Sequence, residues 1–380
     1  GERLLREGRL AVLLVAGGQG SRLGFERPKG LFPIGPVSQA SLFQIHLEKV
    51  LALSRRFGQP VPLLIMTSEA THQETEAFLH DHRRFGLPAE QVFLFKQGTM
   101  PALDAATGKL LLEDRHRLCL SPDGHGGTLL ALRTSGLLQA MQERGITQVF
   151  YFQVDNPLVK IGDPDFLGTH LAARAQVSTK VVPKRGPTDR MGNVVSVAGR
   201  CAIVEYSDLP RQWAERRGPD GELYFRWGNT AIHLFALEFL EQVTGTDRAL
   251  PFHVARKKVP YLDETGQRVE PEQENALKFE RFIFDVLPLA ERFTVVETSR
   301  REEFEPLKNA TGDDSPESVR RALANRAGDW LARAGVEVPR NEQGDPIWPL
   351  EISPLLALDA EELATRLRPG LKITGPTWLQ

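Results

Sequence analysis

The sequence predicts an α/β protein in which helices cover both faces of a mostly parallel sheet, with a small unit at the C-terminus. Two features of the 380 residues carry this expectation. Apolar strand-like runs alternate with helix-like segments through the first half, and this order favours parallel strands joined by right-handed crossovers. From about residue 340 onward the chain is dense in proline and glycine, which is typical of a separate small unit.

The first half supplies strands and helices in alternation. The run Leu10–Ala16 is continuously apolar and ends at two glycines, as expected for a strand buried on both faces. Ser41–Phe57 has apolar residues at helical spacing, and Ser41 can cap that helix. The next elements expected are a strand at Val61–Met66, a helix opened by a capping box of Thr71 and Glu74, a strand at Val92–Phe95, a helix at Thr128–Arg144 and a strand at Val149–Val154.

After Asp155 the alternation is less regular. Two short runs separated by Ala198-Gly199-Arg200 predict an antiparallel hairpin of Val194–Val197 and Ala202–Tyr206. Leu277–Ala290 is expected to be helical because its aromatic and aliphatic residues share one face. The remaining expectations are helices at Pro164–Ala175, Ala236–Val243 and Pro316–Ala334, strands at Val177–Val182, Ala231–Phe235 and Phe293–Glu297, and a loop at Arg211–Glu222.

Composition and charge exclude several classes of protein. Lys and Arg number 47 and Asp and Glu 49, and this balance argues against a surface built to bind nucleic acid or an anionic membrane. No apolar stretch approaches the roughly 18 residues of a membrane-spanning helix. Two cysteines, Cys119 and Cys201, are too few for a disulfide scaffold or a zinc cluster. We therefore expect a cytoplasmic protein with reduced, buried thiols and no nucleic-acid or membrane partner.

The segment 16–30, AGGQGSRLGFERPKG, directly follows the first predicted strand. Its glycines allow close approach of a ligand to the backbone, and exposed N–H groups in such a loop bind anions. Arg22 and Lys29 add positive charge beside them. The loop therefore predicts a polyphosphate site.

Two common phosphate-binding motifs do not fit this loop. A P-loop needs a lysine followed by Ser or Thr after G-x-x-x-x-G, whereas Lys29 is followed by Gly30. The dinucleotide fingerprint G-x-G-x-x-G would need a glycine at position 23, which is Leu23. A Rossmann dehydrogenase is therefore disfavoured.

The loop resembles that of the sugar-nucleotide pyrophosphorylases, G-G-x-G-[ST]-R-L with Pro-Lys a few residues on. Nine further segments extend the resemblance from about residue 10 to 365: FKQGTMPAL, SPDGHGG, VDNPLVKIGDPDFLG, KVVPKRGPTDRMGNV, VEYSDL, WGNTAIHLF, VARKKVPYLD, PLKNA and EISPL. The chain is thus similar to the UDP-sugar pyrophosphorylase family (UDPGP type), and within it to the eukaryotic-type UDP-N-acetylglucosamine pyrophosphorylases.

The resemblance implies a fold and an activity. The fold is a three-layer α/β/α, Rossmann-like nucleotidyltransferase core of GT-A type with a mixed, mostly parallel sheet. A catalytic domain is expected at residues 1–335, with a UTP-binding half at about 10–155 and a sugar-binding half at about 156–335, followed by a small domain at 336–380. The phosphate of a sugar 1-phosphate, expected to be N-acetylglucosamine 1-phosphate, attacks the α-phosphorus of UTP in line and yields a UDP-sugar and pyrophosphate.

Phosphate-binding and metal roles carry over to four residues. Arg22 and Lys29 are expected to contact the UTP phosphates, and Lys308, in PLKNA, the sugar phosphate and α-phosphate. Asp155 ends a predicted buried strand, where open α/β sheets place their ligands, so its carboxylate is expected to bind Mg²⁺ together with phosphate oxygens and water. The alternative for Asp155 is a turn cap.

Uracil and sugar contacts also carry over. The resemblance implies nucleotide binding by Ala16, Gly17, Gly18, Gly20, Gln97, Pro122, Gly126 and Gly127, and sugar binding by His125, Gly192, Glu205 and Asn229. Gln97 presents a donor and an acceptor, which suits the imide edge of uracil.

His125 departs from the pattern. The N-acetylglucosamine branch has Asn at this position and the glucose branch has His, so glucose 1-phosphate or a broader set of sugars is the alternative substrate. A non-catalytic nucleotide-sugar binding protein on the same fold is the remaining alternative.

Overall fold

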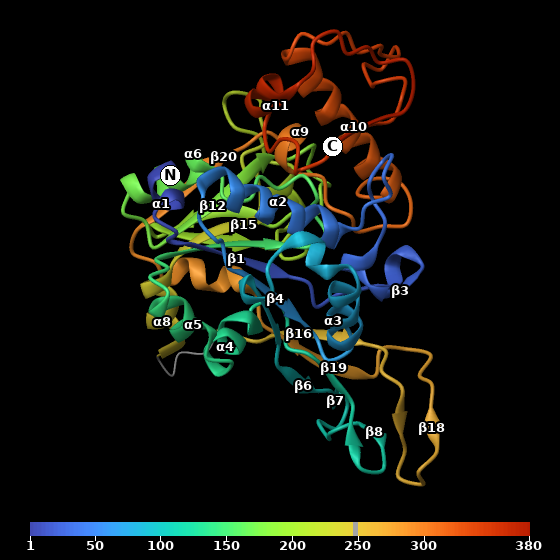
Figure 1. Ribbon diagram of the computed structural model, residues 1–380. Coiled ribbons are helices and arrows are strands. Elements are labelled where there is room, and N and C mark those ends of the chain that lie inside the picture. Colours follow the sequence, from blue (N-terminus) through green and yellow to red (C-terminus); the bar gives the residue numbers. More distant parts are fainter. Residues whose placement is uncertain (246–249) are drawn as a thin grey trace.

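The computed structural model describes residues 1–245 and 250–380. Its centre is a nine-stranded sheet in the order β14-β13-β15-β11-β1-β4-β5, with β12 beside β15 and β20 beside β12 (Figure 1). The strands are β1 (Leu10–Val15), β4 (Leu63–Thr67), β5 (Val92–Lys96), β11 (Gln148–Gln153), β12 (Val177–Pro183), β13 (Asn193–Val197), β14 (Arg200–Val204), β15 (Trp227–Ala236) and β20 (Phe293–Glu297).

Strand direction divides this sheet into two parts. β11, β1, β4 and β5 are parallel, with Leu10 of β1 opposite Gln148 of β11. β15 runs antiparallel to β11, β12 and β13, whereas β20 is parallel to β12. The predicted hairpin is confirmed as β13–β14. The sheet is therefore mixed, and its parallel part places the carboxyl ends of β1 and β11 at one edge.

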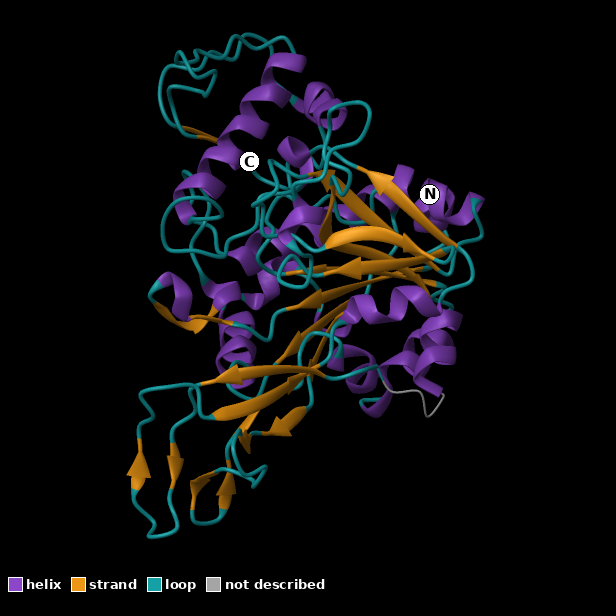
Figure 2. Ribbon diagram, turned by 180° about the vertical axis from the view of Figure 1, so that it is seen from behind, coloured by secondary structure: helices purple, strands orange, loops and turns teal. Residues whose placement is uncertain are grey.

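Helices cover both faces of the sheet, as expected. Along β1, Leu10, Val12 and Leu14 belong to one buried cluster, and Ala11 and Leu13 belong to the other. On the first face lie α1 (Glu2–Arg6), α2 (Leu42–Phe57), α3 (His72–Asp81) and α6 (Pro164–Ala172); on the second lie α4 (Gly127–Thr134), α5 (Leu137–Glu143) and α8 (Leu237–Gly245) (Figures 1 and 2). None of the helices in the described parts of the chain is long and apolar enough to cross a membrane.

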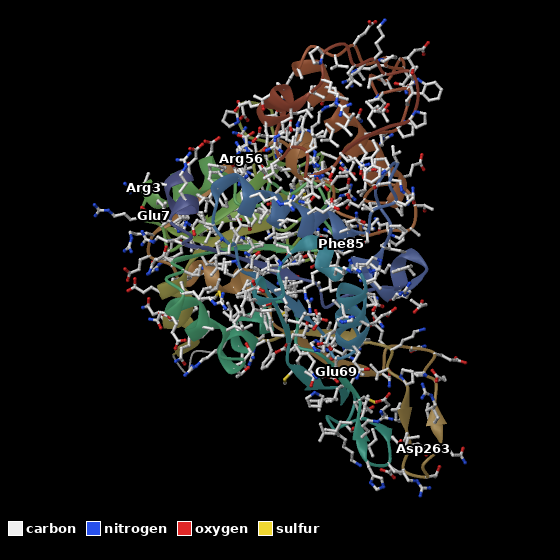
Figure 3. All side chains as sticks on the ribbon, in the orientation of Figure 1. Arg3, Glu7, Arg56, Glu69, Phe85 and Asp263 are labelled. Carbon is white, nitrogen blue, oxygen red and sulfur yellow. The ribbon has the colours of Figure 1, made fainter. Side chains whose placement is uncertain are left out.

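The C-terminal residues form a smaller cluster against α10 (Pro316–Arg333). Val319 and Leu323 of α10 join the first buried cluster of the core, whereas Trp330 and Leu331 pack with Leu350 and other residues of the tail. The tail contains β21 (Leu350–Ile352), α11 (Ala360–Arg366) and β22 (Thr377–Leu379). Arg56 of α2, labelled in Figure 3, pairs with Asp359 at the start of α11. Because α10 belongs to both clusters, a domain boundary at residue 335 stays a prediction.

Two β hairpins project from the core as an arm that the sequence did not indicate (Figure 2). Asp263 lies at the tip of one of them (Figure 3). Cys119, free and buried like Cys201, lies in a small apolar cluster at the base of the arm. The strands of the arm and its base are β6 (Thr99–Pro101), β7 (Leu103–Asp104), β8 (Leu112–Asp114), β9 (Arg117–Leu118), β10 (Leu120–Pro122), β16 (His253–Lys257), β17 (Tyr261–Leu262), β18 (Arg268–Val269) and β19 (Ala276–Glu280).

One predicted helix is wrong. Leu277–Ala290 begins within strand β19, which pairs with β16, and continues as the 3₁₀ segment η5 (Ile283–Leu289). The apolar residues at 279, 282, 283 and 286 fit a helical period, but Pro288 lacks the N–H that a regular α-helix would use there.

Other element predictions need smaller corrections. The helix expected at Thr128–Arg144 is two helices, α4 and α5, separated at Gly136, whose φ of 75° is left-handed. Thr71 does not form the expected capping box, and its hydroxyl accepts a hydrogen bond from the Ser68 amide instead. The loop at Arg211–Glu222 contains a short helix. The remaining short elements are α7 (Arg211–Ala214), α9 (Arg300–Glu303), η3 (Arg83–Gly86) and η4 (Ala89–Gln91).

Candidate active site

The glycine loop lies at the carboxyl end of β1 and folds back on itself. β2 (Gln19–Gly20) pairs with β3 (Phe25–Pro28), and two 3₁₀ turns, η1 (Ser21–Leu23) and η2 (Lys29–Leu31), follow them in turn. The Lys29 amide donates to the Gly18 carbonyl at 3.0 Å, which returns the lysine to the start of the loop. A Cβ at Gly20 would lie 2.7 Å from the Phe25 carbonyl oxygen, so this close turn requires glycine.

The residues predicted to bind uracil gather on one side of this loop. A Cβ at Gly17 would lie 2.4 Å from Oε1 of Gln97, so the two residues are in direct contact. The Ala16 amide is anchored to the Met66 carbonyl at 2.8 Å. Pro122 ends β10 opposite Thr99 of β6. The residues that follow β1 and β5 therefore lie close to the segment that contains Gly126 and Gly127.

Asp123, which sequence reasoning missed, lies between these segments. Its amide donates to the Gly98 carbonyl at 3.1 Å, and a Cβ at Gly127 would lie 2.0 Å from its Oδ1. Burial raises the pKa of the Asp123 carboxyl, against the opposing charge of Arg281. Asp123 belongs to the SPDGHGG segment, but nothing in the sequence indicated that its carboxylate lies between Gly98 and Gly127.

Three of the four predicted phosphate and metal residues come together from distant segments. Nζ of Lys29 lies 3.9 Å from Oδ2 of Asp155 and donates to the Leu307 carbonyl at 3.3 Å. The Asp155 carbonyl in turn accepts from the Leu307 amide at 2.8 Å. Lys308 is therefore adjacent in sequence to a residue that bonds both Lys29 and Asp155. The side chains of Lys29 and Asp155 are 20% and 13% exposed, so both remain accessible to a ligand.

Arg22 is exposed in η1 and is not part of this cluster. Within residues 1–245 and 250–380 it makes no hydrogen bond or ion pair with another side chain. Its guanidinium donors are thus available to a ligand.

Three of the four predicted sugar residues, Gly192, Glu205 and Asn229, form a third group. A Cβ at Gly192 would lie 2.9 Å from Oε1 of Glu205, and the Asn229 amide donates to the Gly192 carbonyl at 2.8 Å. Burial and the charge of Asp208 raise the pKa of Glu205, while Lys308 opposes the shift. The charge of Lys308 thus acts on the Glu205 carboxyl.

His125 packs against residues of the mispredicted segment. Its Nδ1 accepts a hydrogen bond from the Ile283 amide at 3.1 Å, and its ring stacks on Phe282 with centroids 5.2 Å apart. Burial lowers the pKa of His125 to about 4, so the ring is neutral near pH 7. His253, paired with Asp285 at 2.7 Å, stacks on the same Phe282. Sequence reasoning missed Phe282 and His253 in this role because it assigned Phe282 to a helix.

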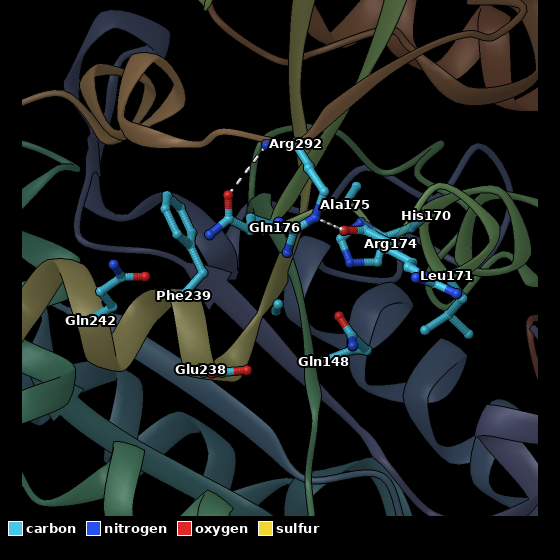
Figure 4. Close-up of a pocket in the computed structure, with 11 residues that line it drawn as sticks. Gln148, His170, Leu171, Arg174, Ala175, Gln176, Glu238, Phe239, Gln242 and Arg292 are labelled. Atoms are coloured by element: carbon cyan, nitrogen blue, oxygen red, sulfur yellow. Dashed lines mark hydrogen bonds between the residues drawn. The ribbon is translucent and has the colours of Figure 1, made fainter.

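A cavity of about 320 Å³ lies at the opposite edge of the sheet (Figure 4). Gln148, Gln176 and Arg292, which line it, stand at the amino ends of β11, β12 and β20. Ligands of open α/β sheets bind at the carboxyl ends, so the glycine loop remains the candidate site. In the described part of the chain, no three His, Cys, Asp or Glu side chains gather to hold a metal ion by themselves.

The chain is similar in sequence and in fold to known proteins. Residues 2–323 match a family model described as UTP–glucose-1-phosphate uridylyltransferase. A UDP-N-acetylhexosamine pyrophosphorylase-like protein 1 from Xenopus tropicalis is 41% identical over 97% of this chain and 77% of its own length. A UDP-N-acetylglucosamine pyrophosphorylase from Saccharomyces cerevisiae is 38% identical over 89% and 73%. The solved structure of the Trypanosoma brucei UDP-N-acetylglucosamine pyrophosphorylase with an inhibitor is 31% identical, with a TM-score of 0.84 over 96% of this chain and 76% of that one.

Proposed function

The chain belongs to the UTP–glucose-1-phosphate uridylyltransferase family, and on that premise we propose that its sugar substrate is N-acetylglucosamine 1-phosphate. The activity is that of a UDP-sugar pyrophosphorylase, which converts UTP and a sugar 1-phosphate into a UDP-sugar and pyrophosphate. The N-acetylated sugar is supported by relatives 38–41% identical over most of the chain, whose names specify N-acetylglucosamine or N-acetylhexosamine.

The observation that carries the mechanism is the junction of Lys29, Asp155 and the Leu307-Lys308 segment. In-line phosphoryl chemistry needs no covalent intermediate, so the protein acts by positioning two anions and by offsetting their charge. Lys29 contacts the UTP phosphates from the end of the glycine loop. Lys308, on the side of Glu205, binds the phosphate of the sugar and brings it to the α-phosphorus.

Arg22 and the loop amides bind the phosphates that leave. The exposed guanidinium of Arg22 can contact two phosphate oxygens at once. No atom lies within 4 Å of the place that a Cβ would take at Gly18, so an anion can approach the backbone of the loop there. Together these groups stabilise the charge that develops on pyrophosphate.

Asp155 is the residue that would hold Mg²⁺. The residue is largely buried, and its partly exposed carboxylate lies next to Lys29. This fits an ion that keeps water and phosphate oxygens as its other ligands, because Mg²⁺ sites commonly use one or two carboxylates. When bound, the ion would neutralise charge on the reacting phosphates.

The two halves of the site select their ligands separately. Gln97, against Gly17, offers its amide to the imide edge of uracil, with the backbone of Ala16, Pro122, Gly126 and Gly127 around the base. Glu205 and Asn229 accept or donate hydrogen bonds to sugar hydroxyls beside Gly192, whose missing Cβ lets the Glu205 carboxyl approach the backbone closely. The free, buried cysteines support a reducing, cytoplasmic location.

Glucose 1-phosphate is the second candidate substrate, and His125 favours it. Pyrophosphate release from UTP and Mg²⁺ with a panel of sugar 1-phosphates distinguishes the two. We expect the highest kcat/KM with N-acetylglucosamine 1-phosphate, and a clear preference for glucose 1-phosphate would refute the proposed substrate. His125→Asn is expected to shift selectivity further toward the N-acetylated sugar; unchanged ratios would remove His125 from the selection of sugar. Binding of UTP without any turnover would support a non-catalytic binding protein.

A further inference from the structure

Arginines gather around a cavity that the proposed mechanism does not use. The cavity, of about 300 Å³, lies between the segment that carries Lys308 and helix α10. Four arginines and one carboxylate line it, together with Asn325: Arg185, Arg300, Arg301, Arg321 and Glu305. We call it the arginine pocket.

Part of the donor capacity of this pocket is unused. Arg185 donates to Glu305 at 2.7 Å, and Arg300 donates through Nη2 to Asp189 at 2.8 Å. Nε of Arg300 is nevertheless buried without a partner. Arg321 is exposed and makes no hydrogen bond or ion pair with the residues that the structure describes. Guanidinium groups with free donors around a concave site are typical of oxyanion binding.

Asn325 contributes an unpaired hydrogen-bond acceptor, whereas the arginines contribute unpaired donors. The residue is 8% exposed, and its Nδ2 donates to Asp345 at 2.6 Å, which fixes the orientation of the amide. Its Oδ1 is buried and has no donor within the described residues. A ligand that satisfies both the guanidinium groups and Asn325 therefore offers several acceptor oxygens and one hydroxyl donor. Hydrogen phosphate and hydroxylated phosphate monoesters meet this requirement, whereas sulfate has no proton to donate at neutral pH.

We propose that the arginine pocket is a second, non-catalytic binding site for a phosphate group, either hydrogen phosphate or a small phosphate monoester. Its size is at the lower end of the ligand pockets in proteins, which suits a ligand of this kind. Arg321 and Arg300 contact the phosphate oxygens, and Oδ1 of Asn325 accepts a hydrogen bond from the hydroxyl group.

Both ends of the Lys308 segment approach Arg185 of this pocket. Glu305 begins the segment and is paired with Arg185, and Asp314 near its end lies 3.9 Å from the same arginine. The carbonyl of Asp314 accepts hydrogen bonds from the amides of Lys308 and Asn309. A phosphate in the pocket competes with Glu305 and Asp314 for Arg185, and thereby changes how Lys308 is held. This consequence rests on the proposed function, whereas the binding itself does not.

Calorimetric titration of the full-length chain with inorganic phosphate tests the binding. Lys29→Ala is the background of every titration, because it removes a phosphate contact of the catalytic site. In that background, Arg321→Gln is expected to weaken phosphate binding about tenfold, as for the loss of one charge-assisted hydrogen bond. Arg333→Gln on the same helix is the matched control, because Arg333 is exposed and pairs with Glu302 outside the pocket. Equal weakening in both variants, or no phosphate binding, would overturn the proposal.

Two further experiments identify the chemistry of the ligand and the effect of its binding on the KM for the sugar 1-phosphate. Glycerol 3-phosphate in place of phosphate distinguishes a monoester from the free ion, and tighter binding of either one supports the site. Sulfate is expected to bind more weakly than phosphate; equal affinity would overturn the role of Asn325. In the enzyme with intact Lys29, phosphate is expected to raise the KM for the sugar 1-phosphate less in Arg321→Gln than in Arg333→Gln. If uridylyl transfer is absent, the KM measurement fails, but the titration still shows whether phosphate binds to the pocket.

Discussion

Lys180 is the buried cation on which the architecture behind the candidate site depends. Its Nζ donates to Asp163 at 2.7 Å and to both oxygens of Glu303 at 2.6 and 2.7 Å. The three side chains are 2%, 8% and 7% exposed. The carbonyl of Glu303 accepts from Asn156, the neighbour of Asp155, at 2.7 Å. Disruption of this cluster is therefore expected to displace the segment after β11 that contains Asp155, the proposed metal ligand.

Lys180→Met keeps the length of the side chain and removes its charge. Two carboxylates then remain buried without their main partner, and the loss of one member of a buried ion pair typically lowers the free energy of unfolding by about 3–5 kcal/mol. Lys160, 3.2 Å from Asp163, still offers partial compensation, so we expect a loss of about 3 kcal/mol. Equilibrium unfolding in urea, followed by circular dichroism, measures the difference.

Lys160→Met is the matched control. Its side chain is 37% exposed and contacts the same Asp163, and exposed ion pairs contribute about 1 kcal/mol or less. A loss in Lys180→Met below about 1 kcal/mol, or one no larger than in Lys160→Met, would refute the reasoning, since it would mean that the buried charges need no cation.

Three further predictions concern the loop, the tail and pH. Lys29→Ala is expected to lower kcat about 10²–10³-fold, the typical effect of removing one group that stabilises transition-state charge, as measured by pyrophosphate release. Glu351 accepts hydrogen bonds from the Val37 and Ser38 amides at 2.8 and 2.7 Å, so Glu351→Ala is expected to loosen the turn after the glycine loop, raising the KM for UTP more than it lowers kcat. Burial lowers the pKa of His46 and His233 to about 3 each, from 6.5. The unfolded chain therefore binds protons first as pH falls below 6.5, and each histidine is expected to cost about 2 kcal/mol of stability at pH 5, as measured by urea unfolding at pH 7 and pH 5.

Each of these expectations has an outcome that contradicts it. A kcat within tenfold of the wild type would place Lys29 outside the chemistry. An unchanged KM for UTP in Glu351→Ala would mean that the tail does not hold the loop. Equal stability at pH 5 and pH 7 would show that the buried histidines are protonated at no cost.

The carboxyl-edge position of the site could be predicted because it depends on local patterns. Continuous apolarity marked β1 as buried on both faces, and the sheet confirms this residue by residue. The glycines and Lys29 follow that strand directly, and Asp155 follows β11, which lies beside β1. Their 3.9 Å separation thus follows from two adjacent parallel strands. The place of Lys308 depends on the hydrogen bond between Leu307 and Asp155, 152 residues apart, and only the resemblance indicated it.

The aromatic surroundings of His125 could not be predicted from the sequence. Between residues 277 and 290 the apolar residues fit both a helical and a strand period, and the pairing of β19 with the distant β16 decides between them. The helical interpretation hid the contact of Phe282 with His125 and His253. Asp123 and Arg321 were missed similarly, because the partners that make them informative, or the lack of partners, appear only in three dimensions.

Transfer of the uridylyl group itself is the most direct test of the proposed chemistry. The wild-type protein, with Mg²⁺, is incubated with UTP labelled at the α-phosphorus and N-acetylglucosamine 1-phosphate, and the labelled products are separated. The mechanism predicts that the label appears in UDP-N-acetylglucosamine, in an amount equal to the pyrophosphate released, and that Lys29→Ala loses both products together. Label that appears in UMP, or that stays in UTP with every sugar 1-phosphate offered, would contradict it.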